Sequence, residues 1–284
     1  MQAIDYLLIG HITQDQTPHG PMLGGTAAYC AGTIQAFGLR VGLVTSARAN
    51  EPLLRQLETN GVQIVNRPAP HTTTFTNTYH PAGRRQILSA RAAPLGPADV
   101  PPEWKDTPIV HLGPVAAEIA PDCAAHFPGA FMALTPQGWL RAWDAEGIVR
   151  RCAWPAAAEV LPLASATVLS PEDLQSDPAQ IAAYIRQTRL LVITQQQRGA
   201  DIHIGAEVYH VPTRTVDEVD PTGAGDIFAA VFFARLWQHP NDPVGAARLA
   251  NYLATTSITR QGLASVPTSA ELHAALAALG MTDT

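Results

Sequence analysis

Small residues and one carboxylate stand together where an apolar segment begins, in the last quarter of the chain. Residues 222–226 read TGAGD, and nearly every residue from 227 to 236 is apolar, which is typical of a helix buried on most sides. Backbone N–H groups in the first turn of a helix lack intrahelical partners, and small side chains let an anion approach them. The pattern predicts a phosphate site formed by Gly223, Ala224 and Gly225.

Asp226 follows directly at the edge of this predicted anion site. A carboxylate there would repel a phosphate unless it had a chemical task, and accepting a proton from a hydroxyl nucleophile is such a task. We therefore interpret Asp226 as a general base beside a phosphoryl group. The alternative is a glycine-rich turn in which Asp226 only complements the helix dipole.

A second carboxylate, Asp15, follows the first apolar run of the chain in the segment GHITQD, residues 10–15. Ligands bind beyond the carboxyl ends of parallel strands, and one carboxylate can accept hydrogen bonds from two hydroxyl groups. Asp15 is thus a candidate for holding a polyhydroxylated substrate. The alternative is a loop aspartate that caps a turn.

The string VDPTGAGD, residues 219–226, resembles the C-terminal signature of the ribokinase-like (PfkB) carbohydrate kinases. The resemblance implies that residues 223–225 stabilise the phosphoryl group in transfer and that Asp226 deprotonates the acceptor hydroxyl. It also implies that Asp220 and Thr222 line a site for a monovalent cation such as K⁺. The fold expected from it is a doubly wound, mainly parallel α/β sheet with a small β-sheet lid.

Other segments extend the resemblance across residues 4–267, in the order found in the family. Residues 24–46 are similar to the N-terminal signature, in which two glycines open a helix against the substrate, and residues 191–204 resemble a nucleotide-binding strand and turn. ATP with Mg²⁺ is the implied donor. The implied substrate-binding residues are Asp15, Gly24, Gly25, Thr26 and Arg141, and the implied nucleotide-binding residues are Thr194, Gly199, Gly223, Asn251 and Gly262.

Several positions depart from the family pattern. Tyr29 stands where most members have an Asn that contacts the sugar, and Gln196 stands where the nucleotide turn normally has Gly. The sequence SPED, residues 170–173, replaces the Asn-x-x-Glu motif that supports the magnesium shell. Glu172 or Asp173 could still hold Mg²⁺ through water.

Some of these departures resemble the myo-inositol kinase-like members of the family. An aromatic at 29, the segment QGWLR at 137–141 and Pro221 are shared with that branch, which favours a cyclic polyol such as myo-inositol as acceptor and Arg141 as one of its ligands. Arg141 could equally form a surface salt bridge. Two other functions stay open: a nucleoside kinase in which Phe75 and Tyr79 stack on a base, and a catalytically weakened small-molecule sensor.

The elements that must position these residues alternate along the chain. Short apolar strands are predicted at 4–9, 41–45, 109–112, 130–134, 167–169 and 190–194, and helices at 26–37, 51–59, 178–188, 242–259 and from Thr268 onward, where Glu271 completes a capping box. Short, almost fully apolar strands indicate a parallel sheet covered on both faces. The prediction is a doubly wound α/β fold in a single domain, residues 1–284.

Residues 72–91 break this alternation. Thr alternates with aromatic residues, a turn is predicted at 80–83, and a return strand follows. With residues of about 11–23, this segment is interpreted as the lid; a solvated edge ribbon is the alternative. A lid of this kind is compatible with a monomer or with a homodimer paired through the lids.

The composition restricts the classes of partner. The chain has 284 residues, 46% hydrophobic and 15% charged, with a formal charge of −6 and no basic run interleaved with aromatics. These features favour a small polar substrate over a nucleic acid. Cys30, Cys123 and Cys152 lack a metal-ligand spacing and are predicted to be reduced thiols. The N-terminal apolar run is short for a signal peptide or membrane span, so the expected location is the cytoplasm.

Overall fold

The computed structural model describes residues 2–18, 20–80, 83–174 and 177–282. Its centre is a nine-stranded sheet in which the seven strands from β13 to β5 run parallel to one another. At one edge, β14 is antiparallel to β13, and β15 is antiparallel to β14. The spatial order is β15 (Glu207–Val211), β14 (Ala200–Ile204), β13 (Leu191–Thr194), β12 (Ala166–Leu169), β9 (Phe131–Leu134), β8 (Ile109–Leu112), β1 (Tyr6–Ile9), β4 (Val41–Arg48) and β5 (Gln63–Ala69).

The sheet is doubly wound about β1. The chain first extends through β4 and β5 on one side of β1, then returns to β8 on the other side and continues outward to β13. The order therefore reverses between β1 and β8, which run in register from Tyr6 beside Ile109 to Ile9 beside Leu112. In open α/β sheets the binding crevice forms at the carboxyl ends of the strands at this kind of switch point.

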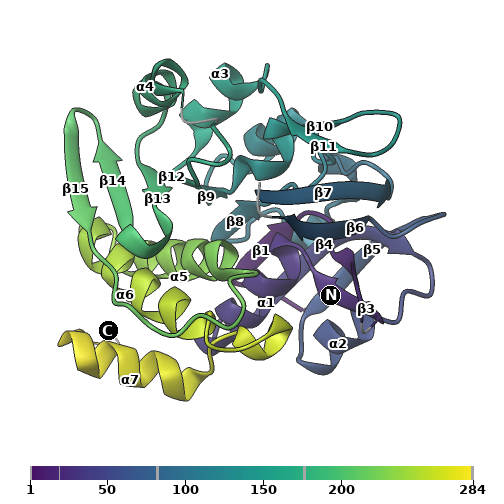
Figure 1. Ribbon diagram of the computed structural model, residues 1–284. Coiled ribbons are helices and arrows are strands. Elements are labelled where there is room, and N and C mark those ends of the chain that lie inside the picture. The colour runs from purple at the N-terminus through teal and green to yellow at the C-terminus, as the bar shows by residue number, and fades with distance from the viewer. Residues whose placement is uncertain (1, 19, 81–82, 175–176, 283–284) are drawn as a thin grey trace.

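Helices cover both faces of the sheet (Figure 1). One face carries α1 (Thr26–Ala36), α5 (Ala224–Gln238), α6 (Pro243–Ser257) and, outside them, α7 (Ser269–Leu279); α2 (Leu54–Thr59) lies near β5. The other face carries α4 (Pro178–Gln187) and α3 (Ala157–Val160). Successive side chains of β1 enter opposite cores, because Leu7 and Ile9 pack with Trp104 whereas Tyr6 and Leu8 pack with α1.

Helix α5 is the innermost helix. Every residue from Ile227 to Leu236 is buried, and Phe232 and Phe233 are fully enclosed. This confirms the prediction that the apolar segment after Asp226 forms a helix surrounded by protein. Because its body is fixed between the sheet and α6, the orientation of its N-terminus is also fixed.

A separate four-stranded sheet, here called the lid, stands on the carboxyl-end side of β1 and β5. Its order is β3 (Gly20–Gly24), β2 (Thr13–Thr17), β6 (Thr74–His80) and β7 (Gly83–Ala90), with β2 and β6 parallel and the other pairs antiparallel. These strands fall within the segments predicted for the lid. Of the predicted turn at 80–83, residues 81 and 82 lie outside the described part of the chain.

Most predicted elements are present, with two kinds of difference. The helix predicted at 51–59 begins at Leu54, because Glu51 takes part in a turn and its carboxylate accepts the Leu53 N–H. The chain between β8 and β12 lacks full crossover helices; it uses 3-10 turns, the hairpin β10 (Arg141–Trp143) to β11 (Val149–Arg151), and the single turn of α3. Cys30, Cys123 and Cys152 are free thiols, as predicted. No described helix combines the length and apolar character needed to cross a membrane.

Candidate active site

The N-terminus of α5 opens at Gly223, which adopts a left-handed conformation with φ of 82°. A Cβ atom at Gly223 would lie 2.4 Å from Cδ1 of Tyr29, so both the backbone and the neighbouring ring require glycine here. No side chain caps this helix, and a Cβ on Gly225 would meet nothing within 4 Å. The Ala224 N–H donates to the Pro221 carbonyl at 3.2 Å. The mouth of α5 is thus open to an anion at Gly225.

Asp226 lies in the first turn of α5 and is only partly exposed. Its Oδ1 accepts a hydrogen bond of 2.7 Å from Thr26 Oγ1, on α1. Burial raises the pKa of this carboxyl to about 6; the Thr26 hydrogen bond and the charge of Arg141 oppose the rise, whereas Asp173 and Asp15 add to it. A carboxyl with this pKa can accept and release a proton near neutral pH.

The N-terminus of α1 faces the same space. Gly25 precedes the helix with φ of 86°, and no side chain caps it. A Cβ atom on Gly24 would lie 2.4 Å from Oδ2 of Asp15, whose Oδ1 accepts a hydrogen bond of 3.0 Å from Thr13 Oγ1. Glycine at 24 is therefore what allows the Asp15 carboxylate of the lid to reach across the start of α1. The structure brings Asp15, Gly24, Gly25 and Thr26 together, as the sequence predicts.

Arg141 begins β10 and points toward the base of the lid. Its guanidinium carbon lies 6.0 Å from the centroid of the Phe75 ring, and its Nη1 donates to the Val115 carbonyl at 3.3 Å. The charge of Arg141 lowers the pKa of Asp226, so the two groups interact electrostatically. Phe75 itself is 3% exposed and packs among Leu88 and other apolar residues of the lid base. The side chain of Tyr79 lies outside the described part of the structure.

Tyr29 occupies the space between the two helix N-termini. It is 3% exposed, and its ring lies against Gly223. Burial raises the pKa of the phenol, and the nearby charges of Asp226, Asp15 and Asp220 raise it further. The hydroxyl therefore stays protonated.

Asp220 organises the loop that leads to Gly223. Its Oδ1 accepts the Thr222 N–H at 2.9 Å, and its Oδ2 accepts the Gly262 N–H at 3.4 Å. The N–H groups of Val219 and Asp220 both donate to the Ile258 carbonyl. The Asp220 carboxylate thus joins this loop to the segment after α6, and the predicted cation-site residues Asp220 and Thr222 do lie together.

The two acidic candidates for magnesium lie just after β12. Oδ2 of Asp173 accepts both the N–H and the hydroxyl of Ser170 at 2.9 Å, and Oε1 of Glu172 accepts the Gln196 side-chain amide at 2.9 Å. Among the described residues, no group of three His, Cys, Asp or Glu side chains could by itself hold a metal ion. This arrangement suits Mg²⁺ held largely by water and phosphate oxygens, with one carboxylate in support, and does not suit an all-protein cage.

The predicted nucleotide strand and turn form the end of β13 and the start of β14. Thr194 closes β13, and its hydroxyl donates to the Leu169 carbonyl at 3.4 Å. Gly199 has φ of 97°, and a Cβ there would lie 2.1 Å from the Val211 carbonyl oxygen. Gln196 also has a positive φ, 53°, a conformation that favours glycine. This backbone conformation fits the Gly that the family resemblance leads us to expect at position 196.

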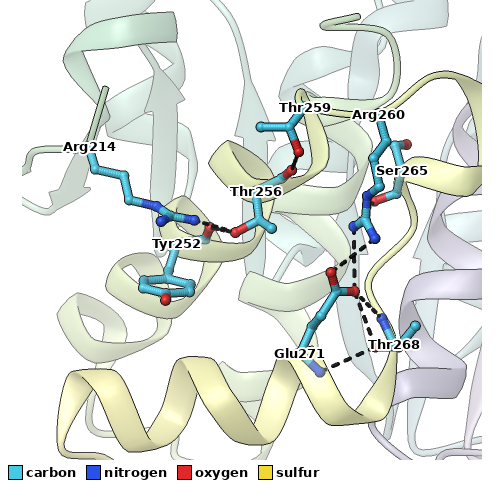
Figure 2. A network of polar contacts seen from close by, with 8 residues as sticks. All are labelled: Arg214, Tyr252, Thr256, Thr259, Arg260, Ser265, Thr268 and Glu271. Carbon is cyan, nitrogen blue, oxygen red and sulfur yellow. Dashed lines mark hydrogen bonds and ion pairs between the residues drawn. The ribbon is translucent and has the colours of Figure 1, made fainter. Parts of the chain in front are cut away.

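The segment after β15 is attached to α6. Asn251, which the sequence assigns to nucleotide binding, donates its amide to the Val211 carbonyl at 2.9 Å and so fixes the backbone there. Arg214 stacks on Tyr252, with 4.3 Å from the guanidinium carbon to the ring centroid, and donates to Thr256 (Figure 2).

Farther along the same side, Arg260 pairs with Glu271 at 2.9 Å (Figure 2). Glu271 also completes the predicted capping box with Thr268. These contacts join the end of α6 to the first turn of α7, beside the loop that Asp220 organises.

Sequence reasoning missed the polar residues at the base of the lid. His11 is fully buried; its N–H donates to Glu118 Oε1 at 2.9 Å, and its ring contacts Thr73 Oγ1 at 2.7 Å and the Ala93 carbonyl at 2.8 Å. Because a carbonyl only accepts, the proton lies on Nε2, and burial lowers the pKa of the ring. His11 thereby ties the strand entering the lid to the strand leaving it. Its place one residue after Gly10 was the signal available.

Residues 145–270, which include β11, the β13–β14 turn and the mouth of α5, match the family model described as pfkB family carbohydrate kinase. Over this part of its length the chain is similar to the pfkB kinases. It is a phosphotransferase with an alcohol group as acceptor.

Curated relatives of the chain are kinases of different acceptors. A cytidine kinase of Thermococcus kodakarensis is 28% identical over 254 residues, which cover 81% of this chain and 88% of that protein. A fructokinase of Klebsiella pneumoniae is 30% identical over 51% of each chain. Since these relatives differ in acceptor, their likeness leaves the acceptor of this kinase to be decided by its own site.

Solved structures share the fold at lower identity. A pyrophosphate-dependent kinase in the ribokinase family, complexed with a pyrophosphate analogue and myo-inositol, superimposes with a TM-score of 0.80 and 18% identity, covering 95% of this chain and 99% of that one. A ribokinase-type protein from E. coli in complex with ATP and Mg²⁺ has a TM-score of 0.73 and 20% identity, covering 96% and 99%. The ribokinase-like architecture is therefore shared along almost the whole chain.

Proposed function

We propose that this kinase transfers the γ-phosphoryl group of ATP to one hydroxyl of a neutral polyhydroxylated acceptor, a sugar or a cyclic polyol such as myo-inositol. The observation that carries the proposal is the Asp226 carboxyl, whose pKa is raised to about 6 and which stands in the uncapped first turn of α5. A general base works best when its pKa lies near the working pH.

In the proposed reaction Asp226 accepts the proton of the acceptor hydroxyl. That oxygen forms a bond to the γ-phosphorus, the bond from phosphorus to the bridging oxygen breaks, and ADP leaves with the electron pair. The first-turn N–H groups of α5 would stabilise the charge on the transferred group. When bound, Mg²⁺ supplies charge neutralisation of the donor phosphates, with Glu172 and Asp173 as its candidate supports.

The charges around the acceptor space support a neutral substrate. Asp15 and Asp226 both lie on this side, whereas the cation that faces them, Arg141, already contacts Phe75 and the Val115 carbonyl. A phosphate group already present on the acceptor would be repelled by these two carboxylates, whereas hydroxyl groups can donate hydrogen bonds to both. We propose that Asp15 binds two adjacent hydroxyl groups of the acceptor and that Arg141 contacts the acceptor from the opposite side.

Release of ADP from MgATP tests the proposal against a panel of myo-inositol, ribose, fructose, hexose phosphates and cytidine, each with wild type and Asp226→Asn. We expect turnover of one neutral polyol or sugar, lost by at least a thousandfold in the variant, with acceptor binding retained. Near-normal kcat in Asp226→Asn would remove the base assignment. A parallel assay replaces ATP by pyrophosphate and measures the release of phosphate. It is included because Gln196 and its hydrogen bond to Glu172 alter the predicted nucleotide turn.

A nucleoside kinase is the second candidate, favoured by the likeness to a cytidine kinase over most of both chains. The burial of Phe75 in the lid base speaks for a packing role and against an exposed ring awaiting a nucleobase. Turnover of cytidine in the panel, without turnover of myo-inositol or sugars, would decide for this candidate. Saturable acceptor binding with no ADP or phosphate formed would decide for a sensor.

A further inference from the structure

We propose that Thr26 is a positioning residue for the base Asp226, holding one carboxylate oxygen so that the other faces the acceptor hydroxyl. This role rests on the proposed function and differs from the substrate-binding role that the sequence predicts for Thr26. The two residues lie 200 positions apart, on the first turns of α1 and α5.

The hydrogen bond between them is short and enclosed. Thr26 Oγ1 donates to Asp226 Oδ1 over 2.7 Å, and Thr26 is 2% exposed. The Thr26 hydroxyl has one proton, so donating it to Oδ1 leaves Oδ2 to receive a proton from substrate. A bond of this kind to an ionised carboxylate also favours the charged form, which a base needs before it can act.

The direction of the Thr26 hydroxyl is set by the opposite branch of its side chain. A Cβ atom built on Gly113, just after β8, would lie 2.8 Å from Cγ2 of Thr26 and 3.2 Å from Oγ1 of Thr135. The Thr26 methyl group therefore packs directly over the Gly113 backbone. Since threonine rotates as a unit about χ1, a methyl group held by Gly113 fixes the hydroxyl toward Asp226.

Valine at position 26 keeps the shape and removes the donor, whereas serine keeps the donor. For Thr26→Val we expect the plateau kcat to fall about tenfold, because the carboxylate loses its orientation. We also expect the acid limb of the kcat/KM profile to move up by about one pH unit, because the charged form loses its hydrogen bond. Thr26→Ser keeps the donor without the methyl group that orients it, so it should restore most of the acid-limb position but only part of kcat.

The pH profile must be read against the other groups around Asp226. These are Asp15 of the lid, Asp173 after β12, Arg141 of β10, and the phenol of Tyr29 and thiol of Cys30 on α1. The substitutions at 26 leave all of them in place. A purely structural role for Thr26 would lower the melting temperature without moving the acid limb.

Gly113 offers an independent test that changes neither member of the pair. Gly113→Ala should displace the Thr26 methyl group and reproduce the kinetic losses of Thr26→Val. In a Thr26→Ser background the same change should have a much smaller effect, because the methyl group that it strikes is gone. Equal effects of Gly113→Ala in both backgrounds would overturn the packing argument.

Failure of this inference and failure of the proposed function give different results. If Asp226→Asn abolishes turnover but Thr26→Val keeps the wild-type kcat and acid limb, Asp226 is the base and Thr26 does not position it. If Asp226→Asn stays active, the proposed function itself fails. Circular dichroism and melting temperatures of each variant confirm that the compared enzymes are folded.

Discussion

Gly223→Ala should show how closely the anion site depends on one backbone position. Gly223 has φ of 82°, and the added Cβ would lie 2.4 Å from Cδ1 and from Cε1 of the buried Tyr29 ring. A non-glycine residue in the left-handed region costs about 1–2 kcal/mol. Forcing an extra methyl group into a packed site costs about 1–3 kcal/mol more.

The two terms predict a loss of about 2–5 kcal/mol in the free energy of unfolding. For a chain of 284 residues, that corresponds to a melting temperature lower by roughly 3–8 °C. Denaturant titration of wild type and variant measures the loss. When both proteins are assayed fully folded, kcat of the variant should still be lower than that of wild type, because the shifted turn carries the first N–H groups of α5.

Gly225→Ala is the matched control, two residues away. Gly225 has no positive φ, and a Cβ there meets nothing within 4 Å. Alanine is favoured over glycine in a helix by up to about 1 kcal/mol, so this variant should be as stable as wild type or more so. In a Tyr29→Ala background, Gly223→Ala should cost only the backbone term of about 1–2 kcal/mol. Equal stability of the Gly223 and Gly225 variants would refute the reasoning.

Three further outcomes follow from the described contacts. Burial raises the pKa of Asp226 from 3.8 to about 6, so the folded state gains stability as pH falls through 6. The free energy of unfolding of Asp226→Asn should therefore exceed that of wild type by roughly 1–2 kcal/mol at pH 8 and equal it near pH 4, a value discounted because the group is partly exposed. Gln196→Gly should stabilise by up to about 1 kcal/mol, measured by denaturant titration, because φ is 53°; Gly199→Ala should destabilise. His11→Asn should cost about 2–3 kcal/mol, since the Thr73 hydroxyl loses the acceptor of its proton, and steady-state kinetics should show a higher acceptor KM.

The sheet and the mouth of α5 could be predicted because their signals are local. Strands 109–112, 131–134 and 166–169 are short apolar runs, and residues 222–226 keep their glycines and carboxylate within one turn. The capping box at Thr268 and Glu271 has a fixed spacing and was found at its predicted place. Each of these features depends on neighbours along the chain.

Features that depend on contact between distant segments could not be predicted. Thr26 shows no pattern that would pair it with Asp226, and Gly113 is unremarkable until the Thr26 methyl group is seen against it. The strands β10 and β11 contain three arginines and lack strict alternation, so neither strand was predicted. His11 is one buried histidine among ten histidines in the chain, and its role as lid anchor needs the positions of Thr73 and Ala93.

The helices at the candidate site differ from the other long helices in how their N-termini are capped. Among the described helices of ten or more residues, α4, α6 and α7 have side-chain N-caps, Asp177, Asp242 and Thr268, respectively. The two without one, α1 and α5, open instead at a glycine of positive φ, and they are the two joined by the Thr26–Asp226 bond. A capping side chain would occupy the N–H groups that a ligand needs and would forfeit about 1 kcal/mol when displaced. Under the proposed function, the anion and the polyol would supply the contacts that these two uncapped ends lack.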